Sequence, residues 1–315
     1  MKKYILLPLL CCVVFTTNIF ADEGMWLPQL LQELNESEMK EAGLHLSASD
    51  LYDINKSSLK DAIVSLGGFC TAEMISKEGL LLTNHHCAYG AIQGFSSPEN
   101  DYLTDGFFAL SKDQEMNIEG FEVSFLVRID DITDRVLANV TKEMNEDERN
   151  EAIQTSQNEI NSEYADADVD GYQYEVKSFY YGNEFYMFIY NTYRDIRLVG
   201  APPESVGKYG GDTDNWMWPR HTGDFSMLRI YADADNNPAD YSESNVPYTP
   251  KRHLKISMDG VDQGDFTMVM GYPGSTDRFL SSWGIEQALA LYNPSVVDVR
   301  DLKLRTMKEH MDEDL

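Results

Sequence analysis

The chain has 315 residues, of which 53 are acidic and 25 basic, and its formal net charge is −28. Its 43% hydrophobic and 11% aromatic content excludes a disordered chain, and the acidic excess argues against nucleic acid as a partner because a phosphate backbone would be repelled. The length accommodates two domains, or one large domain with insertions.

Residues 1–21 have the pattern of a signal peptide. A short basic start precedes a mostly apolar run at residues 4–20, which is followed by an imperfect small-residue cleavage site. A lipid anchor at Cys11 or Cys12 is disfavoured, because Leu10 stands where a lipoprotein signal needs a small residue. No later stretch is long and apolar enough to span a bilayer. We therefore expect an exported protein, at the cell surface or secreted, that has no membrane span.

Removal of this signal would leave two cysteines, Cys70 and Cys87. Two cysteines in an oxidising compartment predict one disulfide. Closing a loop of this size would stabilise the fold by about 3 kcal/mol in the chain-entropy model.

Helical spacing of apolar residues recurs in four places. Leucines within residues 27–34 predict a helix that ends by Gly43, and residues 58–65 predict a second short one. Residues 134–165 are acidic and weakly periodic, so we expect a helical insertion that packs on one side only. The amphipathic pattern at 282–315 stops without a cap, which leads us to expect a truncated chain.

Strand patterns dominate the remainder. Apolar and polar residues alternate over 121–129, with one break at Leu126, and two aromatic-rich strands within 174–199 flank the turn residues Gly-Asn at 182–183. Residues 225–231 and 266–270 are further strand candidates. These patterns predict a mainly β fold with helical insertions.

One strand leads into a cluster of chemically reactive residues. An apolar run ends at Thr83 and delivers a turn in which His86 directly precedes Cys87, and Cys70 lies upstream where it could anchor that turn. This order resembles chymotrypsin-like peptidases, in which a disulfide holds the general-base histidine within reach of its nucleophile. Such a base needs a carboxylate to fix its tautomer, and Asp224, at the start of a strand, is the candidate.

Longer motifs carry a second, more specific resemblance. They are Met-Trp-Leu-Pro at 25–28, Thr-Asn-His-His-Cys-Ala-Tyr-Gly at 83–90, Gly-Gly-Asp-Thr-Asp-Asn-Trp-Met-Trp-Pro-Arg-His-Thr-Gly-Asp at 210–224 and Gly-Tyr-Pro-Gly at 271–274. Their sequence and order resemble the S46 family of exported bacterial dipeptidyl peptidases, from residue 25 to the end of the chain.

The resemblance implies a chymotrypsin-like (trypsin-like) double β-barrel with a large helical domain between its halves, and release of dipeptides from peptides that have a free N-terminus. His86 matches the base and Asp224 the acid, while Asn215 and Trp216 match residues that bind the substrate's α-amino group. An amide oxygen and an aromatic face both suit an ammonium ion. The family uses no metal or organic cofactor, and a homodimer is expected for the full-length enzyme.

By the same resemblance, residues 22–280 would be the N-terminal part of the peptidase domain, and 281–315 the start of the helical domain. The family's nucleophilic serine lies in a Gly-x-Ser-Gly-type motif in the second barrel. Ser275 follows Gly274 but lacks the next glycine, and Ser205 precedes a valine. We therefore expect the serine and its oxyanion hole to lie beyond this chain, which alone would be inactive.

Other interpretations of the histidines and cysteines stay open. His85, His86, Cys70 and Cys87 have the ligand types of a zinc site, but adjacent histidines followed by cysteine are poorly spaced for a tetrahedron, and the compartment favours a disulfide. We expect His85 to be structural, and His221 to be structural or to help position Asp224.

Two further functions compete with the peptidase. Residues 166–171 match the first half of a calcium loop, but the twelfth position is Lys177 where a bidentate glutamate belongs. The protein would then be an acidic calcium- or partner-binding module. It could also be an inactive exported remnant that binds peptides without cleaving them.

Overall fold

A computed structural model describes residues 25–166, 171–214, 217, 219–274 and 280–314. The chain divides into two units. One contains the described residues 27–274 and holds all the strands named below, and the other contains the helical segment 280–314. Each unit is taken by itself.

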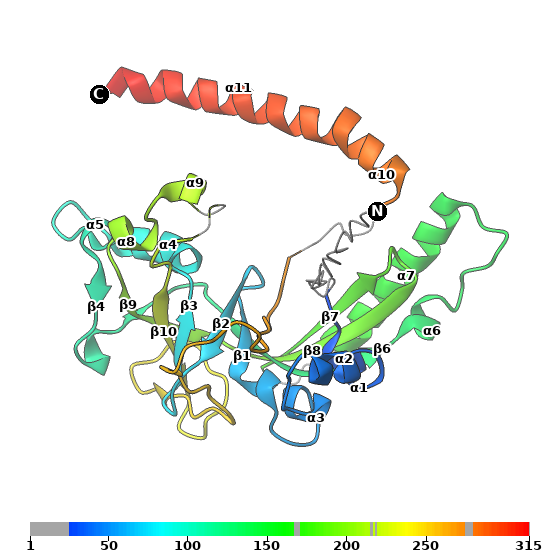
Figure 1. Ribbon diagram of the computed structural model, residues 1–315, viewed down its shortest axis with the longest axis horizontal. Coiled ribbons are helices and arrows are strands. Elements are labelled where there is room, and N and C mark those ends of the chain that lie inside the picture. The colour runs from blue at the N-terminus through cyan, green and yellow to red at the C-terminus, as the bar shows by residue number, and fades with distance from the viewer. Residues whose placement is uncertain (1–24, 167–170, 215–216, 218, 275–279, 315) are drawn as a thin grey trace, which may run out of the picture. The chain divides into compact units, whose positions relative to one another are not determined.

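The first unit is built on an antiparallel sheet (Figure 1). Its strands are β1 (Ile63–Leu66), β2 (Cys70–Met74), β3 (Leu80–Thr83), β4 (Phe107–Phe108), β5 (Met116–Asn117), β6 (Val123–Asp131), β7 (Tyr172–Phe179), β8 (Glu184–Tyr193), β9 (Asp195–Ala201), β10 (Ser226–Ala232) and β11 (Val246–Pro247). The fold is mainly β with helical elements, as the sequence predicts.

Part of this sheet closes into a barrel. Strands pair in the order β9-β10-β3-β2-β1-β6. The short strand β5 pairs with β9 and continues through residues 118–122 into β6, which pairs with β1. The chain therefore joins the two ends of the row, and the ring leaves no open edge between β9 and β1.

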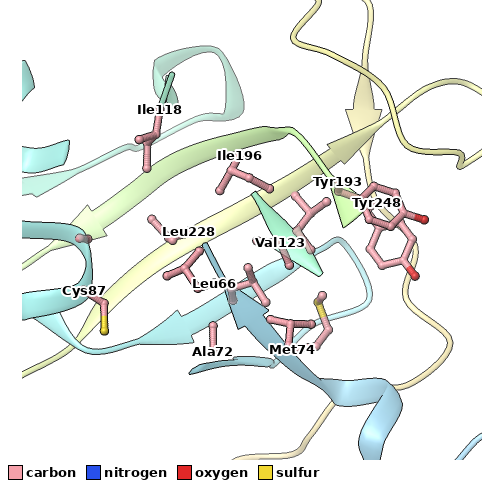
Figure 2. Close-up of a cluster of buried hydrophobic side chains, with 14 of the residues drawn as sticks. Leu66, Ala72, Met74, Cys87, Ile118, Val123, Tyr193, Ile196, Leu228 and Tyr248 are labelled. Carbon is pink, nitrogen blue, oxygen red and sulfur yellow. The ribbon is translucent and has the colours of Figure 1, made fainter. Parts of the chain in front are cut away.

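The barrel interior is filled by alternate residues of its strands, as the two-residue period of a strand requires. Leu66, Ile196 and Leu228 come from three different strands and are fully buried (Figure 2). Burial of each such side chain contributes about 1.5–3 kcal/mol. Cys87 and Ile92 belong to helix α4 (His85–Phe95) and join the same cluster, so the barrel core also holds this helix.

Strands β6, β7 and β8 extend the sheet beyond the barrel. A register shift lies between Leu126 and Arg128, where the sequence pattern breaks. Beyond it, successive residues of β8 serve two faces of the sheet. Phe185, Met187 and Ile189 pack against helices α6 (Thr133–Val136) and α7 (Glu146–Asp166), which lie in the segment where the sequence predicts a helical insertion. Tyr186, Phe188 and Tyr190 form a second cluster on the opposite face.

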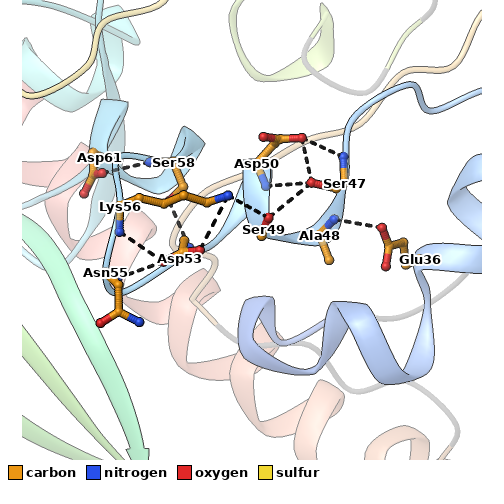
Figure 3. A network of polar contacts seen from close by, with 10 residues as sticks. All are labelled: Glu36, Ser47, Ala48, Ser49, Asp50, Asp53, Asn55, Lys56, Ser58 and Asp61. Carbon is orange, nitrogen blue, oxygen red and sulfur yellow. Dashed lines mark hydrogen bonds and ion pairs between the residues drawn. The ribbon is translucent and has the colours of Figure 1, made fainter.

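The segment before the barrel is fixed by side-chain caps rather than by long helices (Figure 3). Ser47 and Asp50 form a reciprocal capping box at α3 (Ala48–Leu51), and Glu36 accepts a hydrogen bond from the backbone N–H of Ala48 at 3.1 Å. Such caps satisfy the N–H groups that a helix start leaves without partners.

The other short helices lie mostly at the ends of the strands. They are α1 (Leu31–Leu34), α2 (Glu36–Glu41), α5 (Tyr102–Asp105), α8 (Glu204–Gly207) and α9 (Gly211–Asp214), with the 3₁₀ turns η1 (Pro28–Leu30), η2 (Leu59–Ala62) and η3 (Lys112–Gln114). The predicted helix from residue 27 is confirmed as η1, α1 and α2, and it ends where Gly43 adopts a φ of 112°.

Two helix and strand predictions outside the candidate site were wrong. Only the first half of residues 58–65 is helical, as η2, and the second half is β1. Val64 and Leu66 of β1 lie in the barrel core, and this tertiary burial overrides the local helical spacing. Residues 266–270 form no strand. Val269 is fully exposed there, and no described strand pairs with this segment to stabilise an extended ladder.

The second unit is a helical segment, as predicted. It consists of α10 (Ser282–Gln287), the π-helical turn η4 (Ala288–Tyr292), α11 (Asn293–Met311) and the 3₁₀ turn η5 (Asp312–Asp314). None of the residues in α10, η4 or α11 is buried. Within the described residues, no helix has the length and apolar character needed to cross a membrane.

Candidate functional site

The candidate site is built on the first turn of α4. Strand β3 ends at Thr83, Asn84 is the N-cap, and His85 and His86 are the first two helical residues. The sequence predicts a turn at this point, but the chain starts a helix directly. The first N–H groups of a helix have no partners within the helix. The backbone N–H groups at the start of α4 can therefore donate to an acceptor outside the helix.

That acceptor is Asp224, which lies just before β10. Strand β10 pairs with β3, so Asp224 arrives beside the start of α4 although 138 residues separate it from His86. One carboxylate oxygen, Oδ1, accepts the backbone N–H of His86 at 3.0 Å. The other, Oδ2, lies 2.8 Å from the ring nitrogen Nδ1 of the same residue. The structure therefore brings the predicted pair together.

The surroundings keep Asp224 ionised. Burial raises the pKa of its carboxyl, but the hydrogen bonds from the ring and backbone N–H of His86 outweigh burial, and its pKa lies below the ordinary value. The positive end of the α4 dipole favours the same charge. A carboxylate that is fixed and charged accepts a proton-bearing Nδ1, and the second ring nitrogen of His86 is then a free acceptor.

The side chains of His86 and Asp224 differ strongly in their exposure to solvent. The side chain of Asp224 is 9% exposed, whereas that of His86 is 68% exposed. The carboxylate is thus shielded from solvent, whereas the imidazole that it contacts is open to solvent. This arrangement can remove a proton from a hydroxyl group that approaches from outside the barrel.

His85 has the opposite environment although it is the adjacent residue. Its side chain is buried beneath Gly207, where any added Cβ would come within 2.4 Å of the ring. The ring donates to the carbonyl of Pro202, and burial lowers its pKa. These contacts fit the structural role that the sequence analysis expects for His85.

Two residues to which the sequence analysis gave no role contact Asp224. Asn84 donates from Nδ2 to the carbonyl oxygen of Asp224 at 3.1 Å and to Oδ2 at 3.3 Å. Arg220, four residues earlier in the chain, reaches Oδ2 at 3.4 Å. Ser226 holds Asn84 in turn, through a 2.8 Å hydrogen bond to its carbonyl. The position of Asn84 directly before the two histidines was the available signal for this role.

A family model, peptidase S46, matches residues 21–315. The chain belongs to the S46 peptidase family. It is 47% identical over 296 residues to dipeptidyl-peptidase 7 of Capnocytophaga gingivalis, covering 94% of this chain and 41% of that protein. It is 45% identical over 313 residues to the Asp/Glu-specific dipeptidyl-peptidase of Flavobacterium psychrophilum, covering 99% and 43%. The resemblance expected from the motifs is confirmed.

Solved structures agree with this membership. The crystal structure of Porphyromonas endodontalis DPP11 in complex with the dipeptide Arg-Glu matches with a TM-score of 0.82 and 43% identity, over 93% of this S46 chain and 44% of that one. Its complex with Arg-Asp matches with a TM-score of 0.83 at the same identity, over 93% and 43%. The chain thus spans less than half the length of the relatives it matches.

The cysteines of the S46 chain form the predicted disulfide. Cys70 at the start of β2 is bonded to Cys87 in α4, so the bond ties the histidine-bearing turn to the barrel wall. The sulfurs and a ring nitrogen of His86 lie within 4.8 Å of one another, as metal ligands would. Disulfide sulfurs are not thiolates, however, so these three residues offer zinc only one ligand in this state.

Several predicted residues belong to segments other than those that the structure describes. Asn215 and Trp216 lie outside the described residues, as do residues 1–21 and four of the six positions of the candidate calcium loop. His221 is described and exposed, three residues before Asp224. The amine-binding prediction for Asn215 and Trp216 therefore remains a prediction.

Proposed function

We propose that this chain carries the general base and the acid of a serine-type dipeptidyl aminopeptidase, with His86 as the base and Asp224 as the acid. The observation that carries the proposal is the 2.8 Å contact between Nδ1 of His86 and Oδ2 of Asp224, combined with the exposure of the imidazole. Family membership supports the reaction class, and the names of the relatives support dipeptide release.

In the proposed reaction, Nε2 of His86 takes the proton of a serine hydroxyl as the oxygen attacks the carbonyl of the second peptide bond. Asp224 holds the ring in the required tautomer and stabilises the imidazolium that forms. The same nitrogen then gives the proton to the departing amine. We propose that the serine and the oxyanion hole belong to the part of the relatives' length that this chain does not span, so the chain alone would not turn over.

The substrate would be a peptide with a free N-terminus, since one relative is an Asp/Glu-specific dipeptidyl-peptidase and a structural relative binds Arg-Glu. Asn215 and Trp216 would hold the amine, which fixes the cleavage point two residues away. No cofactor is required for this chemistry. The proposal includes a signal peptide at residues 1–21, export to the periplasm or cell surface, and a homodimer of the longer protein.

The test is dipeptide release from a chromogenic dipeptide amide. The chain is assayed alone and mixed with the portion of Capnocytophaga gingivalis dipeptidyl-peptidase 7 that follows the matched region. Activity is expected only in the mixture, and Asp224→Asn should lower kcat by about 10⁴-fold because the histidine tautomer is lost. Asp233→Asn, in a turn at the far end of β10, is the matched control and should keep full activity.

Either of two results would refute the assignment. Turnover by the lone chain would mean that it contains its own nucleophile. Full activity of His86→Ala in an active mixture would mean that another group is the base.

A further inference from the structure

A groove of about 700 Å³ lies on the same unit as His86, between the turn that joins β1 to β2 and the outer strand β7. Gly67 and Gly68 line one end, and residues 172–177 of β7 line the other. This volume is in the range of small-ligand sites. Its lining combines tyrosine rings with serine, glutamine and charged side chains, so it is neither a dry apolar pocket nor a site of one charge.

The groove follows the free edge of β7. Neighbouring residues of a strand face opposite sides of a sheet, so six consecutive lining residues mean that the groove reaches around the edge of the strand. Among the described strands, β7 pairs with β8 alone and ends the row (Figure 1). Such an edge can accept another extended chain through main-chain hydrogen bonds.

The register defines which backbone groups point outward. The N–H of Thr192 donates to the carbonyl of Gly171 at 2.7 Å, and Tyr172 lies opposite Asn191. Hydrogen-bonded and non-hydrogen-bonded pairs alternate along an antiparallel ladder. The N–H and C=O groups of residues 172, 174 and 176 therefore point away from β8, toward the open edge.

The disulfide connects this groove to the candidate base. Gly68 is two residues from Cys70, which is at most roughly 7 Å of extended chain. The sulfur of Cys70 and a ring nitrogen of His86 are within 4.8 Å of each other. A few residues of an extended peptide would therefore cover the distance from the scissile bond to the groove.

We propose that this groove binds the part of a peptide substrate that follows the bond to be cut, and that this part adds as a strand to the edge of β7. The inference rests on the proposed function. An enzyme that releases dipeptides binds only two substrate residues before the bond to be cut, whereas the part of the peptide that follows this bond can be long. Main-chain pairing along β7 would hold many different sequences, because it uses groups that every residue carries.

The experiment measures peptide binding to the chain itself by isothermal titration calorimetry. The probes are an octapeptide with a free N-terminus, its first two residues as a dipeptide, and its last six residues with an acetylated N-terminus. We expect the octapeptide and the acetylated hexapeptide to bind, and the dipeptide to bind at least tenfold more weakly than the octapeptide. Equal affinity of the octapeptide and the dipeptide would overturn the proposal.

The decisive variant is Val176→Pro. It removes one outward N–H while it leaves the ladder to β8 intact, because proline is tolerated where the N–H points away from the sheet. Loss of one main-chain hydrogen bond should weaken hexapeptide binding about two- to tenfold. Val176→Ala shortens the same side chain and keeps the N–H, so it measures the loss of the side chain alone, and Val176→Pro should bind more weakly than Val176→Ala. Circular dichroism and thermal unfolding establish that both variants fold.

The outcomes separate this inference from the proposed function. Unchanged hexapeptide affinity in a folded Val176→Pro variant would refute pairing along β7, whatever the dipeptide-release assay shows. Hexapeptide binding that depends on the N–H of Val176 would support the groove even if the exchange of His86 for alanine left peptidase activity intact.

Discussion

The barrel and the C-terminal helical segment use apolar residues in opposite ways. Leu228 of β10 is fully buried and packs with residues from strands that are distant in sequence. Leu304 of α11 is 65% exposed, and Trp283 of α10 is 78% exposed. The barrel strands exist because tertiary pairing buries them. The helix is held by its own backbone and by i,i+4 ion pairs such as Arg305–Asp301.

Exchange of a leucine for alanine should change the free energy of unfolding very differently in the two regions, and this is the largest effect that we expect. Leu228→Ala should lower the free energy of unfolding by about 2–5 kcal/mol, because it leaves a cavity in a packed core. Leu304→Ala should change it by no more than about 0.5 kcal/mol, because the side chain is solvated already. Urea unfolding followed by fluorescence measures both. Equal losses would mean that the helix contributes to the core as much as the barrel does.

This contrast also explains which predictions the sequence could support. The alternation in β6 and the helical period in α11 are local signals, and each predicts the element that the structure contains. Residues 58–65 carry a helical spacing, yet half of them form β1, because pairing with β2 and β6 is decided by residues far along the chain. The closure of the barrel through β5 could not be predicted, because a strand of two residues is too short to show an alternating pattern.

The disulfide should be the next largest contributor to the barrel. Replacement of both cysteines, Cys70→Ser with Cys87→Ser, should lower the free energy of unfolding by about 3 kcal/mol, because the bond closes a loop with a sequence separation of 17. Chemical denaturation with and without a thiol reductant measures this. Reductant should bring the parent to the stability of the variant and leave the variant unchanged. A parent that is insensitive to reductant would show that the bond does not constrain the unfolded chain.

The candidate site was predictable for its two central residues and not for their supports. The order of His86, Cys87 and Asp224 is a pattern along the chain, so a resemblance could reveal it. The amide of Asn84 and the guanidinium of Arg220 matter only because β10 pairs with β3 and delivers the carboxylate beside them. Such contacts depend on strand register, which single residues do not encode.

His85 should give the barrel a pH dependence of intermediate size. Its folded pKa is lowered from 6.5, mainly by burial and despite the nearby carboxylates of Asp224 and Glu204. The unfolded chain therefore binds more protons, and stability should fall as the pH drops below about 6.5, by at most about 1.4 kcal/mol per pH unit. His85→Gln should flatten the profile of unfolding free energy between pH 7 and pH 5.

His45 is exposed, and His45→Gln serves as the control for the effect of the exchange itself on folding. An unaltered slope in His85→Gln would assign the pH dependence to other groups. The carboxyl of Asp224 should affect stability only at lower pH, because its pKa in the folded protein is below the ordinary value. The stabilisation that it contributes is lost as the pH falls through this lowered pKa.

The smallest effect on the barrel is expected from disruption of the helical segment. Leu302 lies inside α11 and is 60% exposed, and Leu302→Pro removes an internal hydrogen bond and places a ring against the preceding turn. Helical circular dichroism should fall, while the urea midpoint reported by the barrel's tyrosines stays within error of the Leu302→Ala control. A midpoint lowered as far as in Leu228→Ala would show that the barrel depends on α11, and the contrast between the two regions would then fail.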